Sequence, residues 1–338
     1  MTETIKLRNK IIGNGKKTFI IAEIGINHQG NFEKCKKLIK EASKCGADAA
    51  KIQLVNVGES YNEDTKSFKE FKNKSFSDQQ LITLKKYAKK NNILFFATPG
   101  DISSLKRLIQ LKFDLIKISS GLFNNFPLLR EAIKSKIPLM ISTGMADKKD
   151  LIELKLFLNK FNFKKIVILK CVSTYPTSLK ELNLKTFLTL KKIFNYNIGY
   201  SDHSLGDIAC ISAVSLGACV LEKHFTFNKK LIGADHKISM EPKEFKEMVI
   251  KVRETEKALG KENQILSLKL SKSRKNNYRY LTTINEINKN EKFSLNNISF
   301  KRQKKKLGLL PKFFFKIEGK KAKRKIKKNV LIKSSDVK

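Results

Sequence analysis

The runs Ile198-Gly-Tyr-Ser-Asp-His203 and Cys219-Val-Leu-Glu-Lys-His-Phe225 are short, apolar and β-branched, and each reaches a histidine near its end. A connector of helix length joins them. Because side chains alternate along a strand, the residues two before each histidine, Ser201 and Glu222, are expected to share its face. The stretch therefore predicts two neighbouring parallel strands with polar groups and a histidine at both ends.

The same pattern of apolar run, polar turn and amphipathic helical stretch recurs eight times between residues 19 and 260. Eight such units predict a (β/α)₈ TIM barrel. An open nucleotide-binding sheet would show an early Gly-rich loop after a strand, whereas Gly13-Asn-Gly15 precedes the first strand and is interpreted as a turn. Ser77, Asp101 and Asp207 are predicted helix N-caps, and Gly46 and Gly217 predicted helix ends. The predicted strands are 19–25, 49–54, 93–98, 115–120, 138–143, 166–173, 198–203 and 219–225, and the predicted helices are 31–45, 77–91, 101–112, 124–136, 147–161, 183–194, 207–217 and 242–258.

Length and composition limit the class of protein. The 338 residues suit one large domain and a small one. No apolar run is long enough for a transmembrane helix, and the N-terminus lacks the apolar core of a signal peptide. An odd number of scattered cysteines without a Cys-x-x-Cys motif predicts a reduced, cytoplasmic protein that uses its thiols as small apolar side chains. These cysteines are Cys35, Cys45, Cys171, Cys210 and Cys219.

The net charge of +39 raises the possibility of a nucleic-acid or membrane partner. Residues 261–338 contain 24 Lys or Arg and 5 Asp or Glu, a net charge of +19, which leaves +20 for residues 1–260. The basic excess is thus spread along the chain, and the aromatic residues of the C-terminal part cluster at 313–315 instead of alternating with arginine. We therefore expect no specific nucleic-acid partner and no membrane partner.

Polar side chains end every predicted strand, and in a barrel all these ends meet at one mouth. Two lysines and several hydroxyls there suit a phosphate or a carboxylate. Two histidines with nearby carboxylates suit a divalent cation and a hydroxyl-rich ligand. Taken singly, each histidine, lysine or serine also has a structural interpretation as a strand-end residue bonded to backbone. The candidates are Glu23, Lys51, Gln53, Thr98, Lys117, Ser119, Ser120, Ser142, Thr143, Ser173, Tyr175, Ser201, His203, Glu222, His224 and Asp235.

Six motifs spread over residues 15–260 resemble the N-acetylneuraminate (sialic acid) synthase family. They are Phe-Ile-Ile-Ala-Glu-Ile-Gly-Ile-Asn-His-Gln-Gly (19–30), Ala-Asp-Ala-Ala-Lys-Ile-Gln (47–53), Ile-Ser-Thr-Gly-Met (141–145), Gly-Tyr-Ser-Asp-His-Ser (199–204), Glu-Lys-His-Phe-Thr (222–226) and Gly-Ala-Asp-His-Lys-Ile-Ser-Met (233–240). The resemblance implies a transferase of sialic acid biosynthesis. Such an enzyme condenses phosphoenolpyruvate with an N-acyl mannosamine, here N-acetylmannosamine first, and releases phosphate.

The resemblance also implies a role for each residue of the mouth. His203 and His224 would bind a divalent metal, Mn²⁺ first, with Mg²⁺ or Co²⁺ as alternatives. Glu23 and Glu222 are the candidate catalytic carboxylates. Lys51, Thr98, Lys117, Ser120, Ser142, Ser173 and Ser201 would contact phosphoenolpyruvate, with Ser173 standing where the family commonly has Asn. Gln53, Tyr175, Asp235 and Arg302 would contact the sugar together with Glu23, while His236 receives no role.

The C-terminal residues 277–338 resemble the family's small SAF (antifreeze-like) domain, mostly β, and a polar linker is expected at 261–276. The segments 287–294 and 326–333 form a weak internal repeat, in which Asn290 and Asn329 are expected to adopt the left-handed turn conformation. The family's arrangement implies a homodimer in which this domain reaches the partner subunit's barrel. Arg302 lies in a basic segment, 301–306, whose alternative interpretation is a solvated loop.

Several alternatives remain open from the sequence. The sugar is N-acetylmannosamine or a diacetamido derivative. A diacetamido sugar would make the chain an N,N'-diacetyllegionaminate or pseudaminate synthase. Two hypotheses assign the chain to another class of protein: a metal-dependent pyruvate aldolase on a similar barrel, and a nucleic-acid-binding protein. Turnover of pyruvate would identify the aldolase, and steeply salt-dependent binding the nucleic-acid protein.

Overall fold

The computed structural model describes residues 2–233, 235–260, 263, 265–304 and 307–338. The chain divides into two compact units, Met1–Gly260 and Lys261–Lys338. Each unit is described below by itself.

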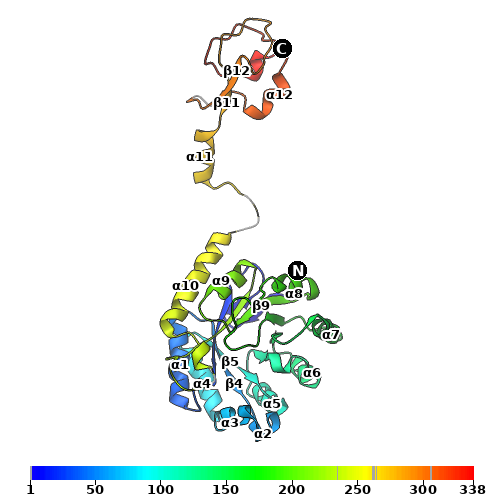
Figure 1. The fold of residues 1–338 in the computed structure, drawn as a ribbon, viewed down its shortest axis with the longest axis vertical. Helices are drawn as coiled ribbons and strands as arrows, with labels where there is room; N and C mark the ends of the chain where they lie inside the picture. The colour runs from blue at the N-terminus through cyan, green and yellow to red at the C-terminus, as the bar shows by residue number, and fades with distance from the viewer. Residues whose placement is uncertain (1, 234, 261–262, 264, 305–306) are drawn as a thin grey trace. The chain divides into compact units, whose positions relative to one another are not determined.

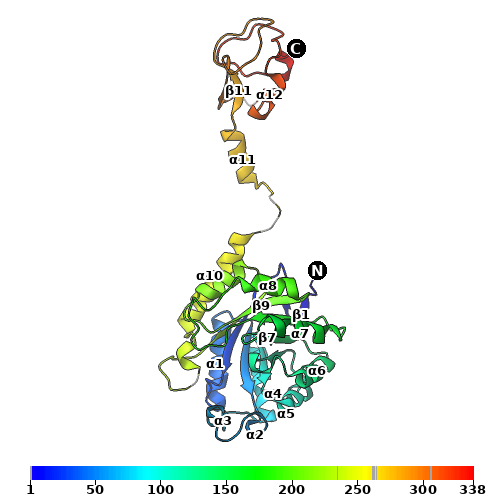
Figure 2. The same ribbon diagram turned by 45° about the vertical axis from the view of Figure 1, so that its right-hand side comes forward.

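The first unit is a closed barrel of eight parallel strands, which confirms the predicted TIM-barrel fold. Consecutive strands pair in chain order, and the last strand pairs with the first to close the ring. Figures 1 and 2 show the helices outside the strands. The strands are β3 (Phe19–Gly25), β4 (Ala49–Leu54), β5 (Leu94–Pro99), β6 (Ile116–Ile118), β7 (Leu139–Ser142), β8 (Ile166–Lys170), β9 (Asn197–Asp202) and β10 (Val220–His224).

Each of the eight predicted helices is present, and local capping chemistry explains where most of them begin. Ser77 forms a reciprocal capping box with Gln80, and the Asp101 side chain accepts a hydrogen bond from the backbone N–H of Ser104. Asp207 occupies its predicted N-cap position but makes no capping bond, because its carboxylate pairs with Lys251 at 2.7 Å. The helices are α1 (Phe32–Lys44), α4 (Asp78–Lys90), α5 (Ile102–Gln110), α6 (Phe126–Lys134), α7 (Lys148–Asn159), α8 (Thr186–Ile193), α9 (Ile208–Ser215) and α10 (Pro242–Leu259).

Two predicted strands are too long at their carboxyl ends. β6 stops at Ile118 and is followed by the short 3₁₀ helix η1 (Ser120–Leu122), and β8 stops at Lys170 instead of reaching Ser173. Hydrogen bonds between neighbouring strand ends accompany these early stops: the Ser120 hydroxyl accepts from the N–H of Gly144, which follows β7, and the N–H of Ser173 donates to the carbonyl of Gly144. The segments that follow β6 and β8 are thus both bonded to Gly144 after β7.

An antiparallel hairpin of β1 (Ile5–Leu7) and β2 (Lys10–Ile12) precedes the barrel and was not predicted, because its strands have only three residues each. Its apolar side chains join the barrel core, and the Asn197 side chain at the start of β9 donates to the carbonyl of Glu3 at 2.7 Å. The hairpin thus packs at the amino-terminal ends of the strands, opposite the mouth. The short helices α2 (Val57–Ser60), α3 (Lys66–Phe71) and η2 (His236–Ile238) were also not predicted.

The second unit has its own small core, formed by residues such as Leu281, Phe293 and Ile332. The two halves of the weak repeat pair through an antiparallel bridge between Ile287 and Ile326, and Asn290 and Asn329 have φ values of 68° and 61°, as predicted. A sheet of β11 (Tyr280–Thr283) and β12 (Ile298–Lys301) accompanies the short helices η3 (Pro311–Phe313), α12 (Phe314–Ile317) and η4 (Ser334–Asp336).

The predicted linker contains a helix, α11 (Leu268–Asn277), that its composition did not reveal. The helix has no buried residue, so it lacks the apolar period by which helices are recognised, and it begins where the Ser267 side chain accepts from the N–H of Leu270. Within the part of the chain that the structure describes, no helix combines the length and apolar character needed to cross a bilayer.

Candidate active site

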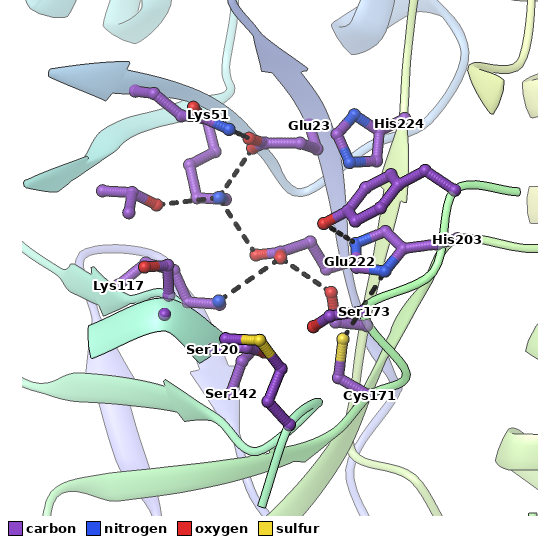
Figure 3. A pocket seen from close by; sticks show the side chains of 17 residues that line it. Glu23, Lys51, Lys117, Ser120, Ser142, Cys171, Ser173, His203, Glu222 and His224 are labelled. Carbon is purple, nitrogen blue, oxygen red and sulfur yellow. Dashed lines mark hydrogen bonds and ion pairs between the residues drawn. The ribbon is translucent and has the colours of Figure 1, made fainter. Parts of the chain in front are cut away.

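A cavity of about 290 Å³ lies at the carboxyl ends of the barrel strands and collects the predicted polar residues. Thirteen of the fifteen residues to which the resemblance gives a role line it, and Asp235 and Arg302 do not; of the two other strand-end candidates, Ser119 lines it and Thr143 does not. Figure 3 shows side chains from opposite sides of the barrel pointing into this space. The lining residues are Glu23, Lys51, Gln53, Thr98, Lys117, Ser119, Ser120, Gly121, Ser142, Met145, Cys171, Ser173, Tyr175, Ser201, His203, Glu222 and His224.

Two lysines and two glutamates form a buried ionic array in the floor of the cavity (Figure 3). The Lys51 ammonium lies 2.8 Å from a Glu23 oxygen and 3.5 Å from Glu222, and the Lys117 ammonium lies 3.5 Å from Glu222. Thr98 accepts a hydrogen bond from Lys51, and Ser201 donates one to Glu222. The alternation of strand side chains produces the array, because every member comes from the inward face of its strand end.

The array separates the proton affinities of its two carboxyl groups. Burial raises the pKa of Glu23 to about 7; Lys51 opposes this shift and Glu222 adds to it. Burial acts in the same direction on Glu222, but Lys117 and Lys51 outweigh it and lower the pKa of this group. At neutral pH Glu222 is therefore ionised, while Glu23 exchanges a proton readily, a division of roles suited to general acid–base chemistry.

The hydroxyl groups around the lysines are only partly used within the protein. Ser142 Oγ and Ser173 Oγ are buried and have no hydrogen-bond partner among the described residues. Burying an unpaired hydroxyl costs free energy, and a polar ligand in the cavity would remove that cost. Together with the ammonium groups of Lys51 and Lys117, they form a surface suited to an anion.

His203 and His224 lie side by side across the cavity from the lysines, with their ring centroids 5.4 Å apart. His203 Nδ1 lies 2.6 Å from the carbonyl oxygen of Val172, which fixes this nitrogen as the donor and turns Nε2 toward the cavity, 3.1 Å from the Tyr175 hydroxyl. His224 Nδ1 is buried and makes no hydrogen bond to any described residue. Burial lowers the pKa of His224, so its imidazole is neutral.

These imidazoles fit the predicted divalent cation as two of its ligands. A carbonyl oxygen that orients the far nitrogen, as Val172 does for His203, is the usual companion of a metal-binding histidine. Among the described residues, no group of three or more His, Cys, Asp or Glu side chains is arranged to hold a metal. The remaining coordination positions would therefore be open to oxygen atoms of substrate or water, as in catalytic metal sites.

Asp235 lies at the edge of the cavity, with a carboxylate oxygen 4.0 Å from His224 Nδ1. Burial raises its pKa to about 6. Gly25 has a φ of 54°, and a Cβ placed on it would lie 3.0 Å from Asp235 Oδ2 and 3.4 Å from Glu23 Oε1. A glycine is needed there because any side chain would press on the two carboxylates. Ala234, in the same motif, lies outside the described residues.

Four residues of the site were missed or given another role: Gly121, Gly144, Met145 and Cys171. Cys171, expected to be a small apolar filler, lines the cavity with its sulfur 3.7 Å from His203 Nδ1. A Cβ on Gly144 would clash with Ser173 Oγ, so a glycine at this position leaves room for the hydroxyl beside the strand ends. Met145 also lines the cavity. Gly144 and Met145 belong to the recognised motif 141–145, which was the available signal for them.

The remaining predictions concern residues away from the cavity. His236, left without a role, is buried and its Nδ1 lies 2.7 Å from the Thr226 hydroxyl, which is a structural contact. Arg302 is an exposed residue of the second unit, directly after β12, so its sugar contact stays a prediction. Lys305 and Lys306, in the same basic segment, lie outside the described residues.

Comparisons with known proteins identify the chain's relatives. Residues 38–264 match the model of the NeuB family. The chain is 37% identical to the N,N'-diacetyllegionaminic acid synthase of Campylobacter jejuni over 85% of this chain and 91% of that protein. It is also 37% identical to the pseudaminic acid synthase of C. jejuni over 96% and 99% of the two chains.

A solved structure agrees with these matches. The N-acetylneuraminic acid (sialic acid) synthetase of Leptospira borgpetersenii, in complex with citrate, superposes with a TM-score of 0.77 and 34% identity, over 81% of this chain and 95% of that one. These findings confirm the resemblance to the sialic acid synthases that the motifs predicted: the chain belongs to the NeuB family.

Proposed function

We propose that this protein is a nonulosonic (sialic) acid synthase, which condenses phosphoenolpyruvate with an N-acyl mannosamine and water and releases phosphate. The observation that carries the proposal is the division of one cavity into two halves. Lys51, Lys117 and the serine hydroxyls suit a phosphate and a carboxylate, while His203 and His224 lie opposite them. One end thus suits an anion and the other a hydroxyl-rich electrophile.

The side chains have distinct tasks in this reaction. Lys51 and Lys117 hold the phosphate and carboxylate while charge moves between them. The enol carbon of phosphoenolpyruvate forms a bond to the aldehyde carbon of the open-chain sugar, and the former carbonyl oxygen takes up a proton. Positive character then develops at C2, where the ionised Glu222 stabilises it.

Water completes the reaction at C2. It adds there and loses a proton, and the bond between C2 and the phosphate oxygen breaks, so that phosphate leaves and a 2-keto acid remains. Glu23, whose pKa is about 7, supplies or accepts the protons of these steps. A divalent cation held by His203 and His224, Mn²⁺ first, would supply Lewis-acid polarisation of the sugar carbonyl.

The sugar is proposed to be N-acetylmannosamine or a related N-acyl mannose derivative. A diacetamido sugar is the second candidate, because relatives named for N,N'-diacetyllegionaminic and pseudaminic acid are each 37% identical to this chain. Phosphate release from phosphoenolpyruvate and Mn²⁺, measured with each sugar in turn, identifies the substrate. Turnover of pyruvate in place of phosphoenolpyruvate would support the aldolase instead.

Substitution of the two histidines tests the metal site. His203→Ala and His224→Ala are expected to abolish detectable condensation and Mn²⁺ binding while circular dichroism shows an intact fold. A variant that kept near-normal, chelator-sensitive turnover would show that these histidines do not hold the metal.

A further inference from the structure

Behind the two histidines, on the outward faces of β9 and β10, lies a buried ion pair that contributes nothing to the cavity wall. Asp202 and Lys223 are partners across these adjacent strands, and the side chain of each is at most 1% exposed. Each directly adjoins a histidine in sequence, Asp202 before His203 and Lys223 before His224. Because strand side chains alternate, the pair points away from the cavity while the histidines point toward it.

The Asp202 carboxylate accepts hydrogen bonds from several donors. One oxygen accepts from the Tyr200 hydroxyl at 3.0 Å and from the backbone N–H and hydroxyl of Ser204 at 3.0 and 2.8 Å. The other oxygen accepts from the Lys223 ammonium, and from the Cys210 thiol of α9 at 3.5 Å. The residues on both sides of His203 are thereby tied to one carboxylate.

The Lys223 ammonium makes a second bond, to the carbonyl oxygen of Ser204. It therefore reaches the side chain before His203 and the backbone after it, while its own chain continues directly into His224. The two peptide segments that carry the imidazoles are linked by one side chain. A shift of either segment would have to break a buried, charged hydrogen bond.

Stability alone does not account for this pair. A buried ion pair is often no more stabilising than apolar side chains of the same size, whereas loss of one partner is strongly destabilising because it leaves a buried charge unpaired. A different ion pair of the barrel, Asp48 with Arg253 at 3.2 Å, joins the start of β4 to helix α10. It is partly exposed and lies at the amino-terminal ends of the strands. Like the ionic array of the cavity floor, the Asp202–Lys223 pair is fully buried, and it lies where the two histidine-bearing strands end.

We propose that Asp202 and Lys223 are positioning residues that fix the distance and orientation of the His203 and His224 rings. The proposal rests on the proposed function, in which these rings bind the metal. In this proposal Asp202 and Lys223 act through the two histidines and do not contact substrate themselves.

Two variants separate positioning from stability. Lys223→Met leaves Asp202 unpaired and is expected to lower the melting temperature strongly. Lys223→Met combined with Asp202→Asn removes both charges and keeps an acceptor for Ser204, so most of the melting temperature should return, while the link to His224 stays absent. Asp48→Asn is the matched control, because it weakens an ion pair at the far end of the barrel.

The readout is the imidazole ¹⁵N NMR spectrum of the metal-free, full-length protein, which is simple because the chain has four histidines. In the double variant the resonances of His203 and His224 are expected to move or broaden while those of His28 stay in place, and Asp48→Asn should leave all of them unchanged. A Mn²⁺ titration followed by electron paramagnetic resonance should show about 10–100-fold weaker binding in the double variant.

The outcomes distinguish this proposal from the proposed function. Unchanged His203 and His224 resonances in a folded double variant would overturn the positioning role. Displaced resonances together with a wild type that binds no Mn²⁺ would support the positioning role and refute the metal site. Equal Mn²⁺ affinities of wild type and double variant, with both binding the ion, would also overturn the proposal.

Discussion

At the scale of single residues, the barrel mouth places two carboxyl groups beside the same ammonium group and still gives them different proton affinities. Glu23 lies closest to Lys51, but burial dominates and its pKa is about 7. Glu222 lies near both lysines and accepts a hydrogen bond from Ser201, which favours its charged form. The sequence predicted both residues but not this difference, since a pKa depends on burial and on distances between strands that a motif does not contain.

Gly144 offers a test of the anion half of the cavity. A Cβ there would lie 2.4 Å from Ser173 Oγ and 2.8 Å from Ser120 Oγ, and its φ is not left-handed, so Gly144→Ala displaces the hydroxyls without straining the backbone. We expect kcat/KM for phosphoenolpyruvate to fall by about 100-fold. Gly121→Ala is the matched control, because its nearest neighbours lie 3.9 and 4.0 Å away. Equal activities of the two variants would argue against the hydroxyl contacts.

His28 makes the stability of the protein depend on pH. Burial, with Lys74 and Lys34 nearby, lowers its pKa from 6.5 to about 3. The unfolded chain therefore binds more protons than the folded one between these values, so this contribution to stability is complete above pH 6.5 and is lost as the pH falls.

The size of this effect follows from the unfolded pKa. From about pH 7.5 to about pH 5.5 the His28 contribution to the free energy of unfolding falls by about 1.4 kcal/mol. Urea unfolding of wild type and His28→Gln at both pH values measures it, and the variant should lose less stability on acidification by this amount. An identical loss in the two proteins would show that His28 is protonated in the folded state.

At the scale of elements, the sequence predicted every barrel strand and its following helix, because the unit of apolar run, polar turn and amphipathic helix recurs eight times. The hairpin β1–β2 was not predicted because its strands are three residues long. Helix α11 was not predicted because it buries no side chain that would create an apolar period. The strand ends at Ser120 and Ser173 were misplaced because polar groups there bond to Gly144 after the neighbouring strand β7, a contact that the sequence does not reveal.

The capping box of α4 predicts a measurable stability effect. The Ser77 hydroxyl accepts from the N–H of Gln80 at 3.2 Å, and the Gln80 side chain accepts from the N–H of Ser77 at 2.9 Å. Ser77→Ala should lower the free energy of unfolding by about 1 kcal/mol in urea titrations. Lys185→Ala at the N-cap of α8, which makes no capping bond, should change it by less than about 0.5 kcal/mol. A larger loss at Lys185 would contradict this account of the caps.

At the scale of the whole molecule, the barrel unit carries fourteen of the fifteen residues to which the resemblance gives a role, and the second unit carries Arg302. The sequence predicted this distribution through motifs, which specify residues along the chain. The homodimer in which this unit reaches the partner subunit's barrel depends on an assembly of subunits and stays a prediction. A complementation experiment addresses the assembly directly.

If the second unit of one subunit completes the partner's site, two inactive variants should restore one another. Arg302→Ala is expected to raise KM for the sugar strongly with little change in phosphoenolpyruvate binding, and His203→Ala to inactivate the barrel. Refolded from an equal mixture, they should regain about a quarter of wild-type activity, because half the dimers would be mixed and each would hold one intact site. No recovery from the mixture, with both variants dimeric, would contradict the exchange between subunits.

The central claim is that the barrel mouth joins phosphoenolpyruvate to a sugar and cleaves the bond between C2 and the phosphate oxygen. The most direct measurement uses phosphoenolpyruvate labelled with ¹⁸O at the bridging position, with Mn²⁺ and an N-acyl mannosamine, and follows the mass of the released phosphate. Phosphate is expected to appear only when the sugar is present and to carry the ¹⁸O label. Unlabelled phosphate, or release that does not depend on the sugar, would contradict it.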